Sequence, residues 1–95
     1  MYLLIFLFKS GLPLEEIKKV SEQRTDRYLQ VEGLIQKYYV LDESTDRAGG
    51  VFVFDSKENL VAFRESELAM STGEAYKFLD APHTRVLEIA KVLRE

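Results

Sequence analysis

The sequence predicts an α+β domain with the element order βαββαβ and a four-stranded antiparallel sheet. Three observations support this prediction. An unbroken apolar run opens the chain, a polar loop separates two strand-like runs near the middle, and stretches with helical spacing of apolar residues follow the first and third strand-like runs. A chain of 95 residues can bury one hydrophobic core but not two, so we expect a single domain over residues 1–95.

The first strand and the first helix follow from the N-terminal third of the chain. Tyr2–Phe8 is apolar throughout and rich in Ile and Phe, and turn-forming residues follow it, which favours a strand buried on both faces. A helix is expected from about Pro13 to Tyr28. Proline suits a first helical turn, and Leu14 and Ile17 begin an apolar pattern of near-helical spacing.

A strand hairpin is expected in the middle of the chain. Leu34–Leu41 is rich in Ile, Tyr and Val, the polar stretch Asp42–Arg47 supplies a loop, and Val51–Phe54 is apolar again. Two strands joined by such a loop pair antiparallel.

The rest of the chain predicts further helix and a last strand. Asp55, Ser56 and Glu58 give overlapping N-cap and capping-box signals before a helical apolar pattern, so a second helix is expected to begin there. Residues 71–73 interrupt this pattern, which predicts a break and another helical segment that ends before Pro82. Residues 84–93 mix helix formers with β-branched residues; we predict a fourth strand, with a helix as the alternative.

A second copy of the chain is expected to cover one face of this sheet. Right-handed crossovers place Tyr2–Phe8 and Val51–Phe54 in the centre of the sheet and both helices on one face. Both central strands are apolar on both faces, whereas the outer strands carry polar residues. These polar residues are Gln36, Lys37, Glu88 and Lys91. An apolar face of this size is seldom left to water, so we expect a homodimer; coverage by the C-terminal tail is the alternative.

Composition excludes several classes of function. A net charge of −3 gives no long-range attraction to phosphate backbones or anionic lipid, so we expect neither a nucleic-acid nor a membrane partner. The absence of cysteine excludes disulfides, thiolate metal sites and cysteine nucleophiles. The N-terminal apolar run reaches Lys9 too soon to span a membrane and lacks the features of a secretion signal, so the expected location is the cytoplasm.

Three tyrosines and the only histidine are candidates for a site. His83 follows Pro82 at the entry to the last strand, where it could act as a base or hydrogen-bond donor; a surface position is the alternative, and it marks no metal site. Tyr38 and Tyr39 are neighbours in a strand, so one should face the helices and the other the dimer partner. Tyr76 could face the same cavity as the helix-facing tyrosine, with a purely structural place in the core as the alternative.

Two cations and a glycine pair complete the candidates. Lys37 and Arg64 could bind an anionic group, with solvation of each charge at the surface as the alternative. Gly49 and Gly50 precede a strand rather than a helix, so they do not form a phosphate-binding loop. We expect them to end the hairpin loop with a positive φ, or to form a bulge where the strand begins.

Two families share this element order. The segment Arg47–Phe54, R-A-G-G-V-F-V-F, is superficially similar to the third-strand motif of RNA-recognition domains, but its base-stacking positions hold Gly49 and Val51, which argues against RNA binding. The block from Gly33 to Phe63 instead resembles the YdhR-like monooxygenases of the dimeric α/β-barrel superfamily. Its most distinctive part reads A-G-G-V-F-V-F-D, the block covers about a third of the chain, and the flanking strands and helix fit in order and length.

This resemblance implies a ferredoxin-like fold, a dimer whose two sheets face each other, and a pocket in each subunit between sheet and helices. Some members of the superfamily oxidise electron-rich aromatic substrates with dioxygen and no metal or flavin. The resemblance therefore implies a monooxygenase without a cofactor that acts on a small aromatic or quinol-like substrate. A deprotonated phenol or quinol can itself give an electron to dioxygen, so the protein must supply shape, a proton acceptor and hydrogen bonds.

The competing hypothesis is a non-catalytic module on the same dimeric scaffold that binds or senses a small molecule. Haem degradation, also found in this superfamily, is disfavoured because no helix here carries a candidate axial histidine. The candidate residues are His83 and Tyr39 for catalysis and, for substrate contacts, Tyr38, Tyr76, Arg64 and Lys37.

Overall fold

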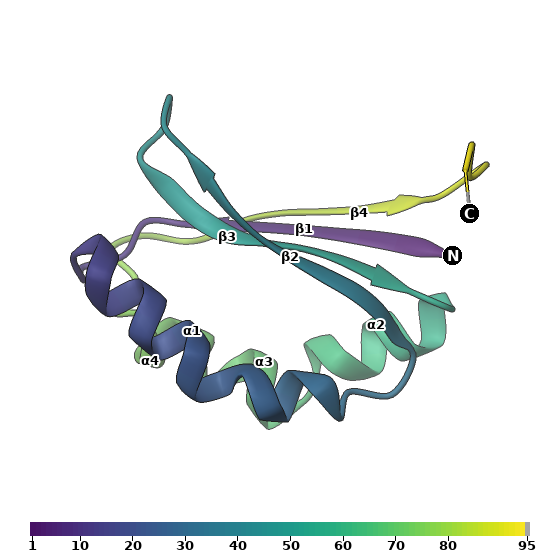
Figure 1. Ribbon diagram of the computed structural model, residues 1–95, viewed down its shortest axis with the longest axis horizontal. Coiled ribbons are helices and arrows are strands. Elements are labelled where there is room, and N and C mark those ends of the chain that lie inside the picture. Colours follow the sequence, from purple (N-terminus) through teal and green to yellow (C-terminus); the bar gives the residue numbers. More distant parts are fainter. Residues whose placement is uncertain (95) are drawn as a thin grey trace.

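The structure is a computed structural model that describes residues 1–94. Within these residues, four antiparallel strands form one sheet and helical segments cover one of its faces (Figure 1). The elements in chain order are β1 (Tyr2–Phe8), α1 (Leu14–Leu29), β2 (Leu34–Asp42), β3 (Arg47–Phe54), α2 (Lys57–Arg64), α3 (Glu67–Met70), α4 (Thr72–Ala75) and β4 (His83–Glu88). The strands lie in the order β2-β3-β1-β4, so β1 and β3 are central as predicted. This is the ferredoxin-like α+β fold.

Most element boundaries agree with the predictions. Ser56 caps α2 as expected, because its side chain accepts a hydrogen bond of 3.2 Å from the backbone N–H of Asn59. The helical region breaks both before α3 and at Ser71, rather than once. The last element is a strand, as predicted, but it ends at Glu88 because its partner Tyr2 is the first residue of β1.

The glycine pair lies inside β3, so the expectation that it ends the hairpin loop or forms a bulge was wrong. Neither Gly49 nor Gly50 has a positive φ, and the pairing of β1 with β3 runs through both without a register shift. Both positions require glycine for another reason, which is the lack of space for a side chain. A Cβ at Gly49 would overlap the carbonyl oxygen of Phe6, and a Cβ at Gly50 would lie 2.9 Å from the Phe52 ring.

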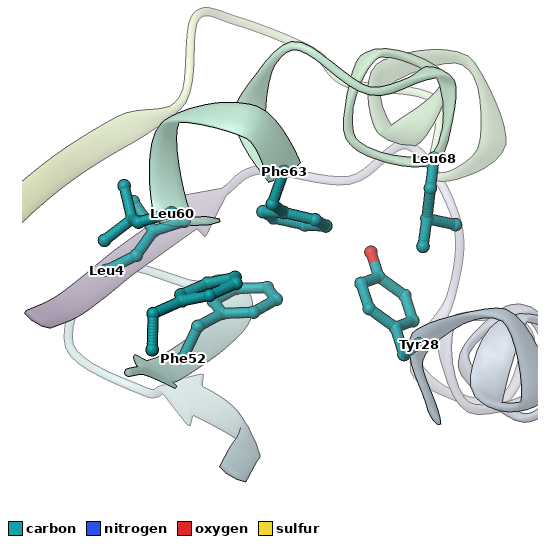
Figure 2. Packing of buried hydrophobic residues seen from close by; sticks show 7 residues of the cluster. Leu4, Tyr28, Phe52, Leu60, Phe63 and Leu68 are labelled. Atoms are coloured by element: carbon teal, nitrogen blue, oxygen red, sulfur yellow. The ribbon is translucent and has the colours of Figure 1, made fainter. Parts of the chain in front are cut away.

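Side chains that point from the central strands toward the helices form the main hydrophobic core. Leu4, Phe52 and Phe54 are almost completely buried and pack with Leu60 and Phe63 of α2. Figure 2 shows Leu60 and Phe63 facing Leu4 and Phe52 across this core. The ring centroids of Phe52 and Phe63 are 5.3 Å apart in the tilted geometry that aromatic pairs prefer.

The other face of the sheet is free of helices within the described residues (Figure 1). Leu3 and Ile5 of β1 and Val51 of β3 are only half-buried on this face, and Tyr38 of β2 is 56% exposed. The C-terminal tail does not pack over them, since residues 90–94 are all exposed and Leu93 is 81% exposed. The face without helices therefore stays apolar and accessible in one copy of the chain.

The described helices include none long and apolar enough to cross a membrane.

The close approach at Gly49 predicts that Gly49→Ala destabilises the fold. The added methyl group would overlap the Phe6 carbonyl and force β1 and β3 apart, at a cost of about 2 kcal/mol or more. Urea unfolding followed by circular dichroism measures this cost. Gly73→Ala is the matched control, because its Cβ would meet only the Phe78 ring, at 3.3 Å. Equal stability of the two variants would contradict the packing argument.

Candidate ligand cavity

A cavity of about 500 Å³ lies between the helix-facing side of the sheet and α1. Two separate apolar clusters pack between the sheet and the helices on either side of it. One cluster includes Tyr28 and Phe63, and the other includes Phe8 and Tyr76. Between them, the cavity is lined in part by the short side chains of Ser21 and Thr25 of α1. A volume of this size is within the range of small-molecule sites.

Lys37 of β2 points into this cavity and is enclosed by three aromatic rings. Its Nζ lies 3.4 Å from the ring centroid of Tyr28, 4.2 Å from that of Tyr39 and 4.9 Å from that of Phe52. These distances allow cation–π attraction when the amine is protonated. Gly50 makes room for the side chain, because a Cβ there would lie 3.2 Å from the Lys37 Cε.

The surroundings of Lys37 favour its neutral form. Burial lowers the pKa of Lys37 to about 7, and the positive charge of Arg24 contributes to this shift. Within residues 1–94, the ion pairs join Lys19 to Glu16 and Arg47 to Asp80, so Lys37 has no carboxylate partner. Near neutral pH a large share of Lys37 is therefore an uncharged amine, which is a base.

Arg24 of α1 is a buried cation near Lys37, and only 7% of it is exposed. Its Nη2 donates a hydrogen bond of 2.6 Å to the Leu68 carbonyl, and weaker contacts reach the hydroxyls of Ser71 and Thr72. Its Nε has no hydrogen-bond partner among residues 1–94. Neutral oxygens thus hold the guanidinium in place without cancelling its charge.

Two tyrosine hydroxyls complete the polar lining. The Oη of Tyr76 lies 2.8 Å from the Oγ of Ser21, which fixes the position of the tyrosine hydroxyl. Burial raises the pKa of both Tyr39 and Tyr76. Both tyrosines therefore remain protonated at neutral pH and can donate hydrogen bonds to a ligand.

The structure brings four of the six candidate residues to this cavity and places two elsewhere. Lys37, Tyr39, Tyr76 and, at the end of α2, the exposed Arg64 line the cavity. Tyr38 pairs with Val51 and points to the face without helices, which fits the expectation that adjacent tyrosines face opposite ways. His83 pairs with Leu7 on that same face and is exposed. The described residues contain no group of three or more His, Asp or Glu side chains placed to hold a metal ion.

Sequence reasoning missed the residues that surround Lys37, and for Lys37 itself it considered anion binding and solvation at the surface, but not enclosure by aromatic rings. Arg24 is three residues after Ser21 and four before Tyr28, and this helical spacing could have placed it on the core-facing side of α1. The spacing was easy to miss because α1 is rich in charged residues that do face water. Phe52 was predicted only as part of a strand and Gly50 only as a loop end or bulge, since their contact with Lys37 depends on the pairing of β2 with β3.

A model of the family described as "Putative mono-oxygenase ydhR" matches residues 3–89, which is most of the chain. The chain belongs to this family. The match extends the resemblance of the central hairpin to β1, α1 and β4. No curated protein sequence matches the chain.

Solved structures of low sequence identity share the family's fold. A "putative antibiotic biosynthesis monooxygenase" from Nitrosomonas europaea superposes with a TM-score of 0.76 at 9% identity, over 96% of this chain and 100% of that one. SnoaB, a cofactor-independent oxygenase from Streptomyces nogalater, gives 0.75 at 9% identity, over 99% and 97% of the two chains. A similarly described protein from Bordetella bronchiseptica gives 0.73 at 17% identity, over 97% of each chain.

The lowered pKa of Lys37 predicts a specific dependence of stability on pH. Between about pH 7 and about pH 9 the unfolded chain keeps the proton on Lys37 and the folded chain has lost it, so the free energy of unfolding should rise with pH. Lys37→Met should remove this rise and stabilise the protein at pH 7 by a few kcal/mol. Urea unfolding at a series of pH values measures both effects. Lys91→Met, an exposed site outside the sheet, should keep the wild-type profile. A persisting rise in Lys37→Met would contradict the assignment.

Proposed function

We propose that this chain is a cofactor-independent monooxygenase that oxidises a small aromatic or quinol-like substrate in the cavity beneath the sheet. The observation that carries the proposal is the cavity itself, which is lined by aromatic rings around an amine and by two tyrosines, Tyr39 and Tyr76. Membership of the mono-oxygenase family supports it, and one protein of the same fold is described as a cofactor-independent oxygenase.

The chemistry needs little from the protein beyond a dry, shaped site and control of protons. An electron-rich aromatic anion gives an electron to dioxygen, and the two radicals combine to form a carbon–oxygen bond. In the simplest case a phenol and dioxygen give a quinone and water, because the ring carbon gains one oxygen atom and the other leaves with two hydrogens. Aromatic walls orient the ring, and exclusion of water strengthens the polar contacts.

The tyrosines suit the role of hydrogen-bond donors. Because burial raises the pKa of Tyr39 and Tyr76, both can stabilise negative charge that develops on the substrate oxygen or on reduced dioxygen. Arg64 lines the cavity at the end of α2, so we expect it to contact a polar substituent of the substrate. The proposal does not use His83 or Tyr38, because each points to the opposite face of the sheet.

An oxygen electrode tests the proposal with a panel of quinols and hydroxylated polyketides. We expect the wild type to consume oxygen with at least one of them, and Tyr39→Phe to lower kcat/KM by roughly 10- to 100-fold through loss of a hydrogen-bond donor. His83→Ala should stay within about twofold of the wild type, because it leaves the cavity intact. Tight binding without oxygen consumption across the panel would favour the binding or sensing module instead.

We also propose that two copies associate through the faces of their sheets that lack helices. Leu3 and Ile5 of β1 lie beside Val53 and Val51 of β3 on this face, which forms an apolar patch across both central strands. A two-fold axis through such a patch would bring the same side chains of both copies together. This arrangement leaves the cavity on the other side of each sheet free for a ligand.

Size-exclusion chromatography with light scattering tests this association. The wild type should be a dimer at micromolar concentration, and Ile5→Glu should raise the dimer dissociation constant by roughly tenfold or more, because it buries two carboxylates at the interface. Val61→Glu makes the same chemical change on the exposed side of α2 and should leave the dimer intact. A monomeric wild type would rule out the proposed interface.

A further inference from the structure

Lys37 is an amine whose surroundings suit two charge states. The rings of Tyr28, Tyr39 and Phe52 offer their π faces to an ammonium ion, with the nearest centroid 3.4 Å from Nζ. The same site withholds the carboxylate that a buried ammonium ion needs, since no ion pair involves Lys37 within residues 1–94. The missing negative charge is therefore expected from the ligand.

We propose that Lys37 removes the proton from an acidic phenol or enol bound in the cavity and then holds the resulting anion as its ammonium partner. In this step the ligand O–H bond breaks and an N–H bond forms on Lys37, and no electrons are transferred. The inference deepens the proposed monooxygenase function and rests on it for the later oxidation, but proton transfer requires no oxygen.

Other groups near the cavity are poorer proton acceptors. Tyr39 and Tyr76 are protonated donors because burial raises the pKa of each. Arg24 is a permanent cation. Of the remaining charged or titratable groups around Lys37, Tyr28 presents its ring, while Lys18, Glu22 and Arg64 are exposed. Lys37 is thus the one base enclosed by the aromatic walls among the described residues.

The positive charges of Lys37 and its neighbour Arg24 favour this transfer over binding of a neutral ligand. Arg24 contributes a positive charge without an acidic partner, and its repulsion opposes protonation of Lys37 while no anion is bound. A phenolate beside Lys37 would be attracted by both cations, so ligand binding and protonation of Lys37 should support each other. The preferred ligand is an aromatic compound with an ionisable hydroxyl group. Its methyl ether should bind weakly.

Absorption spectroscopy with 3-nitrophenol under nitrogen tests this inference on the full chain. Its phenolate absorbs at wavelengths where the protein does not, and its ring is too electron-poor to react readily with dioxygen. At about pH 7.5, just above the pKa of about 7 of Lys37, the free probe is still mostly protonated. We expect the wild type to convert the bound probe to phenolate, and Lys37→Met to lose this band and at least roughly tenfold in affinity. 3-Nitroanisole should bind weakly to both proteins.

Calorimetry in two buffers of different ionisation enthalpy identifies the proton acceptor. In the wild type the proton moves from probe to amine, so few protons should reach the buffer. Lys37→Arg keeps the positive charge but cannot accept a proton, so it should release about one proton per phenolate bound. Lys91→Met should behave as the wild type. A protonated probe in the wild type, a phenolate band in Lys37→Met, or equal proton release from the wild type and Lys37→Arg would each overturn the inference.

These measurements separate the inference from the proposed function. A phenolate band that depends on Lys37, together with no oxygen consumption on any quinol, would uphold proton transfer and refute the monooxygenase. Oxygen consumption that persists in Lys37→Met, without a phenolate band in the wild type, would uphold the monooxygenase and refute the role of Lys37. The comparison of wild type with Lys37→Arg remains decisive even where Lys37→Met fails to fold.

Discussion

The two central strands constrain the whole molecule because both of their faces are apolar but differ in the size of their side chains. Toward the helices, β1 and β3 carry large groups such as Phe8, Phe52 and Phe54, which need a thick layer of protein above them. Toward the other side they carry Leu, Ile, Val and Gly49, which make a flat surface. The aromatic side holds α1 and α2 away from the sheet at two clusters, and the space left between these clusters is the cavity. The same alternation leaves the flat face accessible.

The sequence was sufficient for the order and type of the elements because each carries a local signal. Tyr2–Phe8 is apolar without interruption, and Ser56 occupies an N-cap position that the structure uses. Gly49 and Gly50 misled the prediction because glycine has two uses that look alike in sequence. One is a positive φ in a turn; the other is room for a neighbouring group. The neighbour here is the Phe6 carbonyl, which comes from a strand far away in the sequence.

The site was only partly predictable, because period-two alternation gives the opposite directions of adjacent side chains but not the register between strands. Alternation correctly separated Tyr39 from Tyr38. The face of His83 depends on its pairing with Leu7, and a shift of one residue would have moved it to the helix side. The burial of Arg24 depends on the Leu68 carbonyl of α3, to which it donates a hydrogen bond. Nothing near Arg24 in the sequence indicates that contact.

Lys37 and Arg24 lower the stability of the ligand-free protein for the same reason that they suit an anionic ligand. A buried cation, Arg24, and a partly buried one, Lys37, are less favourable without a carboxylate than apolar residues of similar volume would be. Loss of the proton from Lys37 lowers this cost but leaves the charge of Arg24 in place. An anion beside Lys37 would lower the unfavourable free energy of both positive charges, that of Lys37 and that of Arg24. Its binding would therefore be strengthened by the loss of this repulsion as well as by new contacts. Under the proposed function, an aromatic acid would supply both a ring for the aromatic walls and the negative charge that Lys37 and Arg24 lack as a partner.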